Sequence, residues 1–311
     1  MGLQTAQRRS LRDVLGRTPV SAFRKHYMLL SNPKIEYPNC PLCRSDDARI
    51  IYEHIDSYRV VQCRSCRFYY LSPRPAEVIM ERIYQDDSYY DGVSTIGYES
   101  YHDQAYSLRA TFRRFLLNLK RQGLTGGSLL EVGCGYGFLL DEANGFFDVR
   151  IGTELCSEAA SMARLRADHI YEGDIGQIPA EEKFDCIVTI HVIEHVYDPQ
   201  LFLSQFLGHL KPGGKIIIAT PDMGSLWRYL LGRRWPSFKL PEHVLFFDKQ
   251  SLSILMQHNG LTDIQTLPYP HAFPLSLVAK KLYISLPRFF ADLTIWIPGT
   301  TLAMYGRYYE R

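Results

Sequence analysis

Long hydrophobic runs are absent from this sequence of 311 residues, although hydrophobic residues make up 46% of it. No uninterrupted apolar stretch reaches the ~20 residues that a membrane-spanning helix needs. The first ten residues, MGLQTAQRRS, lack the apolar segment of a secretory signal. Ala6 also breaks the myristoylation pattern, which requires Ser or Thr at that position. We therefore expect a cytoplasmic protein.

A strong net charge is also absent, since the formal charge is +2. This value argues against nucleic acid as the partner, because nucleic-acid-binding domains carry an excess of basic residues. The charge is unevenly distributed, however. Residues 1–75 contain 13 Lys and Arg against 6 Asp and Glu, a balance of +7, so the remainder carries −5.

Cysteine is scarce and is arranged in pairs. Four of the seven cysteines form two C-x-x-C pairs, separated by 19 residues. These four are Cys40, Cys43, Cys63 and Cys66. Such spacing in a chain without a secretion signal predicts a structural Zn²⁺ site, because four thiolates fill a tetrahedron and leave no open position. The alternating run between the pairs predicts the strands of a zinc ribbon, and free thiols in a loop are the alternative.

The whole chain divides into segments that differ in composition and pattern. We expect a basic N-terminal extension, a zinc ribbon, a helical region rich in tyrosine that covers a cofactor site, and a large α/β domain with an apolar insertion. In this order the segments are 1–36, 37–75, 76–123 and 124–311, with the insertion at 273–298. The insertion predicts core or dimer packing, and a peripheral membrane contact is the alternative reading.

A glycine-rich turn organises the large domain. An apolar run leads to Glu131, and glycines follow at every second position as Gly133, Gly135 and Gly137. A strand, a glycine turn and a helix start in this order are typical of a nucleotide-like cofactor site. The spacing is not that of the dinucleotide fingerprint. The acid before the turn would repel a pyrophosphate and would suit a ligand with a free amino group.

The run L-L-E-V-G-C-G-Y-G resembles the first motif of class I S-adenosylmethionine-dependent methyltransferases. Two further stretches resemble the same family: F-D-x-I-V-x-x-x-V-I-E-H-V-x-D-P at 184–199 and L-K-P-G-G-x-I-I-I-A-T-P at 210–221. The resemblance implies an α/β, Rossmann-like sheet of seven strands with S-adenosylmethionine as cofactor.

Cofactor contacts follow from the positions of these motifs. Glu131 is expected to bind the cofactor ammonium, and Glu154, which follows it by 23 residues, to bind the ribose hydroxyls. The resemblance assigns the adenine to Asp174 and Ile175. The full set of expected cofactor residues is Glu131, Gly133, Cys134, Gly135, Gly137, Glu154, Asp174, Ile175 and His191.

Candidate catalytic residues lie in two later stretches. The run H-x-x-E-H at 191–195 looks like an inverted zincin motif, but it leaves a strand, and the cysteines explain zinc better, so we reject a metal there. His191 is expected to face the cofactor side, and His191 and His195 are the alternative bases. The run E-H-V-x-F-F at 242–247 resembles sugar and natural-product methyltransferases that also carry an N-terminal zinc module. The resemblance makes His243 the candidate base beside Glu242, and the alternative is that both residues only hold the loop.

We expect the acceptor to be a small molecule, and a sugar, natural-product or polysaccharide precursor fits best. C-methyltransferases of this type have Tyr two residues before the Glu, and this chain has Leu240, so O-, N- and C-methylation stay open. A zinc-ribbon ribosomal-RNA base methyltransferase is a second reading, which the basic N-terminus favours. A non-enzymatic scaffold with a methyltransferase fold is the third.

Overall fold

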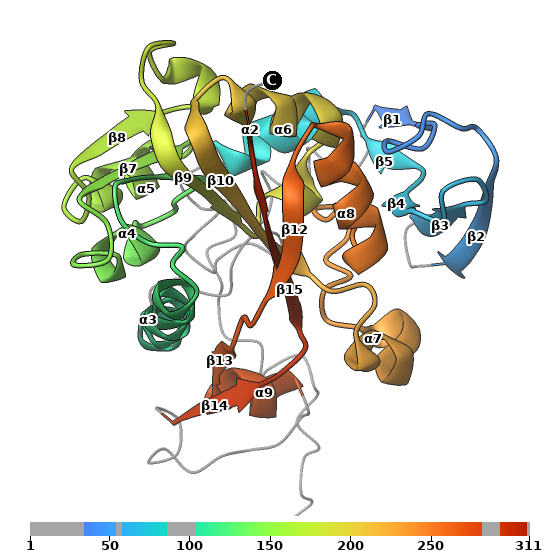
Figure 1. Cartoon of the computed structure of the whole chain (residues 1–311). Helices are drawn as coiled ribbons and strands as arrows, with labels where there is room; N and C mark the ends of the chain where they lie inside the picture. Colours follow the sequence, from blue (N-terminus) through green and yellow to red (C-terminus); the bar gives the residue numbers. More distant parts are fainter. Residues whose placement is uncertain (1–33, 54–57, 86–103, 282–292, 310–311) are drawn as a thin grey trace, which may run out of the picture.

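The computed structural model describes residues 34–53, 58–85, 104–281 and 293–309. A sheet of seven strands forms its centre, in the order β12-β15-β10-β9-β6-β7-β8 (Figure 1). The strands are β6 (Ser128–Val132), β7 (Val149–Glu154), β8 (His169–Glu172), β9 (Phe184–Ile190), β10 (Leu210–Pro221), β12 (Thr262–Leu267) and β15 (Thr301–Arg307). Strands β8, β7, β6, β9 and β10 are parallel, and β15 runs antiparallel to both β10 and β12. The predicted α/β class with a seven-stranded sheet is confirmed.

Helices cover both faces of this sheet. Fully buried β-branched residues such as Ile187 and Ile216 explain why the central strands form, since such side chains pack well on a pleated surface. The covering helices are α3 (Ala105–Arg121), α4 (Phe138–Glu142), α5 (Ser157–Ala163), α6 (Pro199–Leu207) and α8 (Lys249–His258). Helix α6 begins at an Asp198 side-chain cap, and Asp248 and Ser251 form a capping box on α8.

The order of strands reverses between β6 and β9. Successive strands step outward from β6 to β7 and β8, after which the chain returns to the other side of β6 as β9. In open α/β sheets, ligands bind in the crevice that such a reversal opens at the carboxyl ends of the strands. Both the glycine turn after β6 and His191 after β9 lie at this end of the sheet.

A second, smaller sheet lies on the opposite side of α8 from the main sheet (Figure 1). Cys63 ends one of its strands, and the other three paired cysteines lie outside the strands. The small sheet has the order β11-β4-β3-β2, with β2 (Ala48–Glu53), β3 (Arg59–Cys63), β4 (Tyr69–Leu71) and β11 (Leu245–Phe246). Strands β1 (Ile35–Glu36) and β5 (Arg74–Pro75) pair beside it. The expected strands of the ribbon correspond to β2 and β3. Strand β11 comes from the large domain, so this sheet joins the two parts of the chain.

Short elements connect the larger ones. Within 76–123 the described helices are α2 (Glu77–Tyr84) and α3, and the tyrosines at 89, 90, 98 and 101 lie outside the described residues. The segment 222–247 contains α7 (Leu226–Leu231) and η5 (Gly232–Arg234). Two 3₁₀ turns, η3 (Ile175–Gln177) and η4 (Ile193–His195), follow β8 and β9.

The described part of the apolar insertion forms β13 (His271–Pro274), α9 (Leu275–Lys281) and β14 (Thr294–Ile297). The two strands pair with each other below the main sheet (Figure 1). Residues 282–292 lie outside the described part. Among the described residues, none of the helices combines the length and the apolar character that crossing a membrane requires.

Candidate functional site

Two buried carboxylates mark the end of the first two parallel strands. Glu131 lies in β6 and Glu154 ends β7, and the side chains are only 4% and 5% exposed. The strands pair in register, with Glu131 opposite Gly152. Burying an ionised carboxylate is costly unless it is paired or hydrogen-bonded. Two such groups at the carboxyl edge of one sheet therefore require partners, and their partners differ.

Glu154 is held by backbone amides. The N–H of Gly135 donates to Glu154 Oε2 at 2.8 Å, and the N–H of Cys156 donates to Glu154 Oε1 at 3.0 Å. The acid that ends β7 thus fixes the middle of the glycine turn that follows β6. Each carboxylate oxygen has a second lone pair, which leaves capacity for a hydroxyl donor.

Glu131 is less well satisfied. Among the described residues its Oε2 atom has no hydrogen-bond partner, although it is fully buried. Burial raises the pKa of the Glu131 carboxyl well above its ordinary value, and the nearby charge of Glu154 adds to this shift. A cation placed against Oε2 would reverse this shift. The ammonium of S-adenosylmethionine is such a group, and the residues present therefore fit that cofactor.

The glycine turn leaves room for backbone only. Gly133, Gly135 and Gly137 have φ of 75°, 53° and 75°, a conformation that L side chains rarely adopt. A Cβ added to Gly133 would lie 2.5 Å from Val192 Cγ2, and one added to Gly137 would lie 3.0 Å from Ala163 Cα. Cys134 is buried, and its N–H donates to the Thr153 carbonyl at 2.9 Å. The turn is therefore tied to β7 and packed against the segment that follows β9.

The expected adenine contacts lie after β8. Asp174 is exposed, and its side chain accepts the N–H of Gly176 at 3.0 Å as the cap of η3. Ile175 is buried. Both residues are thus at the carboxyl edge of the sheet, on the same side of β6 as Glu154.

His191 forms a pair with Glu194 that sequence reasoning did not anticipate. The Nδ1 atom of His191 lies 3.1 Å from Glu194 Oε1, while its Nε2 atom is buried without a hydrogen-bond partner in the described part of the chain. The second carboxylate oxygen of Glu194 accepts from Thr220 Oγ1 at 2.9 Å. His191 has φ of 55°, so a left-handed backbone directs this side chain. Burial would raise the pKa of Glu194, but the His191 hydrogen bond and nearby histidines lower it to about 2.

His195 and His243 are in ring contact, with centroids 4.8 Å apart. His195 Nδ1 lies 3.1 Å from both the Glu242 carbonyl and the Tyr84 hydroxyl, and His243 Nδ1 lies 2.8 Å from the Ser237 carbonyl. Burial lowers the pKa of each imidazole, which favours the neutral ring. The Glu242 carboxylate, by contrast, lies 3.3 Å from Lys239 Nζ. The structure therefore brings three of the four candidate catalytic side chains together and leaves the Glu242 carboxylate paired with Lys239.

The four paired cysteines converge in the small sheet. All four Sγ atoms lie within 4.8 Å of one another, with Cys40–Cys66 and Cys43–Cys63 at 3.5 Å. Tetrahedral zinc with Zn–S bonds of about 2.3 Å requires sulfur atoms about 3.8 Å apart. The two turns have matching bonds: Cys40 N–H to Ser45 O and Cys63 N–H to Phe68 O. Arg44 and Arg67, directly after each pair, have φ of 66° and 65°.

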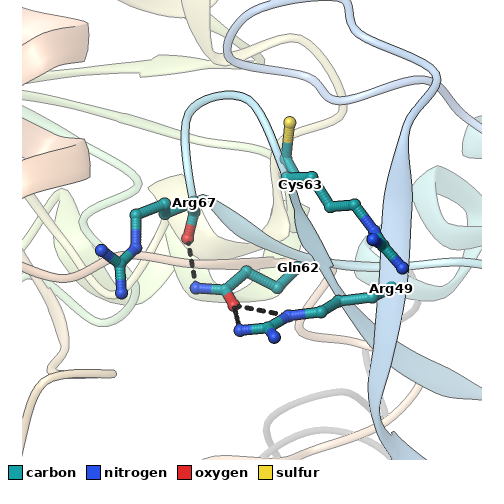
Figure 2. A pocket seen from close by; sticks show the side chains of 5 residues that line it. Arg49, Gln62, Cys63 and Arg67 are labelled. Carbon is teal, nitrogen blue, oxygen red and sulfur yellow. Dashed lines mark hydrogen bonds between the residues drawn. The ribbon is translucent and has the colours of Figure 1, made fainter.

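A basic pocket lies beside the cysteine cluster (Figure 2). Its volume is ≈ 360 Å³, and its lining residues are Arg49, Gln62, Cys63, Arg64 and Arg67. The buried Gln62 side chain accepts from Arg49 Nη2 at 2.8 Å and donates to the Arg67 carbonyl at 3.0 Å. Three arginines around one cavity favour an anionic group.

Comparison with known proteins agrees with this architecture. The family model described as "Methyltransferase domain" matches residues 101–266, which is more than half of the chain. A ubiquinone biosynthesis O-methyltransferase of Bradyrhizobium diazoefficiens is 29% identical over 142 residues, covering 43% of this chain and 52% of that protein. One from Rhodopseudomonas palustris is 31% identical over 138 residues, covering 42% and 51%. The chain thus spans about half the length of the curated relatives it matches.

Solved structures also resemble this chain. Magnesium protoporphyrin IX methyltransferase of Synechocystis PCC 6803, with bound SAH, has a TM-score of 0.44 at 14% identity, covering 73% of this chain and 91% of that one. The N-methyltransferase NodS of Bradyrhizobium japonicum has a TM-score of 0.42 at 18% identity, covering 68% and 99%. On the match of the family model, the chain belongs to the class I S-adenosylmethionine-dependent methyltransferase domain family.

Proposed function

We propose that this protein transfers a methyl group from S-adenosylmethionine to a hydroxyl of a small molecule. The observation that carries this proposal is the pair of buried acids at the carboxyl ends of adjacent strands. Glu131 has an unpartnered Oε2 atom, and Glu154 holds the glycine turn through Gly135. The cofactor offers the complementary groups, an ammonium and a ribose diol. The positions of both acids favour it over a cofactor with a pyrophosphate.

Each cofactor contact has a separate role. Glu131 binds the ammonium. Glu154 accepts hydrogen bonds from the ribose hydroxyls and keeps those from the backbone N–H groups of Gly135 and Cys156. Asp174 and the backbone of Ile175 bind the adenine, as the family resemblance implies. Cofactor chemistry supplies an activated methyl group on a sulfonium. Holding that methyl in line with the acceptor oxygen provides much of the rate enhancement.

His191 is the base that the geometry favours. A histidine oriented by a carboxylate through Nδ1 has a lone pair at Nε2, and that atom of His191 has no partner among the described residues. Val192, the next residue, packs against the glycine turn, which brings His191 close to the cofactor position. His243 was the first choice from the sequence, but its ring is buried against the ring of His195, with centroids 4.8 Å apart.

The class of acceptor is inferred from two observations. The curated relatives are O-methyltransferases, which favours a hydroxyl acceptor over carbon or nitrogen. The arginines of the ribbon pocket favour an anionic group at that pocket, and a phosphorylated sugar or polysaccharide precursor would supply one.

Methylation of compounds in a cell extract tests the proposed function. Purified protein and S-adenosylmethionine carrying a labelled methyl group are added to a small-molecule extract from a strain without the gene. We expect a small molecule that gains one labelled methyl group, and we expect no such product with His191→Gln. Labelling that is equal with and without the protein would contradict the proposal.

Ribosomal RNA is a second candidate acceptor, and the basic ribbon pocket is the observation that favours it. Three arginines beside a zinc module can also bind a phosphate backbone. If RNA were the acceptor, affinity for a ribosomal-RNA fragment would fall steeply with salt, and Arg49→Ala or Arg67→Ala would reduce that slope. Weak affinity for the RNA fragment that does not change with salt concentration would exclude RNA and favour the small-molecule acceptor.

A further inference from the structure

Outside the cysteine site, the described residues contain a second cluster with the spacing of metal ligands. One ligand atom each from Glu194, His195 and His243 lies within 4.8 Å of the other two. Two of these residues are in η4, directly after β9, and the third precedes β11. A backbone bond joins the two segments, from Val244 N–H to the Glu194 carbonyl at 2.8 Å. The cluster is therefore assembled by the fold from residues distant in sequence.

Both imidazoles have the tautomer that a metal ligand needs. A backbone carbonyl can only accept a hydrogen bond, so the contact with Ser237 O at 2.8 Å places a proton on Nδ1 of His243. The contact of His195 Nδ1 with the Glu242 carbonyl at 3.1 Å does the same for His195. The lone pair of each ring is then at Nε2. Metal-binding histidines are typically fixed in this way, with the other nitrogen donating to a carbonyl.

The carboxylate of Glu194 completes the set. It is 1% exposed, and its bonds from His191 Nδ1 and Thr220 Oγ1 come from donors without a permanent charge. No Lys or Arg of the described residues forms an ion pair with it. Buried carboxylates are normally paired with a cation or coordinate a metal. Each oxygen retains a lone pair for that purpose.

We propose that Glu194, His195 and His243 bind a divalent transition metal, Zn²⁺ in the first instance, with at least one coordination position open. Two imidazole nitrogens and one carboxylate oxygen form the donor set of catalytic zinc sites, whereas Mg²⁺ and Ca²⁺ prefer oxygen ligands alone. This site differs from the cysteine site, where four sulfur ligands close the coordination sphere. A metal at H-x-x-E-H was not expected from the sequence, because that run leaves a strand and the cysteines already account for a zinc site. The third proposed ligand, His243, is not part of that run.

The role of this metal rests on the proposed function. At the open position the metal binds the acceptor hydroxyl and lowers its pKa. His191 Nε2 takes the proton, and the oxygen forms a bond to the methyl carbon. The bond from that carbon to sulfur breaks, and its electron pair stays on sulfur. The direct base role that the sequence suggested for His243 is replaced by metal binding.

Metal content of the full chain tests the proposal. Protein is loaded with excess Zn²⁺, freed of unbound metal on a desalting column and measured by inductively coupled plasma mass spectrometry. We expect about two equivalents per chain in wild type and about one in His243→Gln and in His195→Gln. The matched control is His258→Gln at the exposed end of α8, which keeps two equivalents. Circular dichroism establishes that each variant is folded.

Cobalt distinguishes the two sites. Co²⁺ in a thiolate site gives intense charge-transfer bands, whereas an N/O site gives only weak visible bands. We expect His243→Gln to lose the weak bands and to retain the intense ones. One equivalent of Zn²⁺ in wild type, or two in both histidine variants, would overturn the proposal. Calorimetric titration of the same samples with S-adenosylmethionine tests the proposed function separately, since cofactor binding does not require this metal.

Discussion

The carboxylate of Glu154 accepts the backbone N–H of Gly135 at 2.8 Å. An acid at the end of the second strand thereby shapes the glycine turn that follows the first strand. A ribose bound to the same carboxylate would be held against that turn. Glu154 therefore has two roles in the account: it stabilises the glycine turn, and it recognises the cofactor.

Glu154→Ala is expected to weaken cofactor binding by at least about 10-fold, which corresponds to ~1.4 kcal/mol. The substitution removes the ribose acceptor and leaves two buried amides, Gly135 and Cys156, without their partner. Isothermal titration calorimetry with S-adenosylmethionine measures the affinity. Glu181→Gln is the matched control, because this acid is exposed between η3 and β9. Equal affinities of Glu154→Ala and wild type would remove Glu154 from the site.

Glu131 predicts a pH dependence of stability in the absence of cofactor. Burial raises the pKa of this carboxyl above its ordinary value of 4.5. A raised folded-state pKa stabilises the fold below the unfolded-state value, and that contribution is lost as pH rises toward the folded-state value. Glu131→Gln, which carries no charge, should therefore melt increasingly above wild type as the pH rises from about 4.5 to 8.

Thermal melting at several pH values measures this difference, and the cofactor should reverse it. Its ammonium stabilises the ionised carboxylate, so added S-adenosylmethionine should raise the melting temperature of wild type more than that of Glu131→Gln. A melting difference that stays constant with pH would show that Glu131 does not titrate in this range.

His191→Gln is expected to lower kcat by roughly 100-fold or more, in line with the loss of a general base. The cofactor affinity should change little, because the proposed base contacts the acceptor. Steady-state kinetics with the identified acceptor measures kcat, and calorimetry measures binding. The matched control is His271→Gln. The His271 ring lies beside that of His191, with centroids 5.7 Å apart, and its Nδ1 atom lies within hydrogen-bond distance of Thr301 Oγ1. His271→Gln should retain wild-type kcat, and retention of wild-type kcat by His191→Gln would exclude His191 as the base.

Metal bound at the cysteine site should stabilise the methyltransferase domain as well as the ribbon. Strand β4 pairs with β11, Leu71 N–H donates to the Val244 carbonyl, and Val244 N–H donates to the Glu194 carbonyl. Cys40→Ser is therefore expected to lower the melting temperature by roughly 5–10 °C and to reduce activity as well. Differential scanning calorimetry and zinc analysis check both effects. Full zinc content in this variant would contradict the four-cysteine site.

Sequence patterns predicted the fold better than they predicted the acceptor side. Local signals define the glycine turn and the C-x-x-C pairs, since their residues are adjacent in the chain and each needs a special backbone. The Glu194 partnership with His191 also lay within one motif, at a spacing of three residues. The proximity of His243 to His195 could not be read from one motif, because it depends on a backbone hydrogen bond between η4 and the segment before β11. Tyr84, which contacts His195 from α2, was one tyrosine among many in the sequence.

The central claim is that the edge of the sheet formed by β6 and β7 binds S-adenosylmethionine. Calorimetric titration of the folded, zinc-loaded wild-type chain with this cofactor tests it most directly. The account predicts saturable binding with about one cofactor per chain, together with a rise in melting temperature. No binding heat and no thermal shift in protein whose fold and zinc content are intact would contradict it.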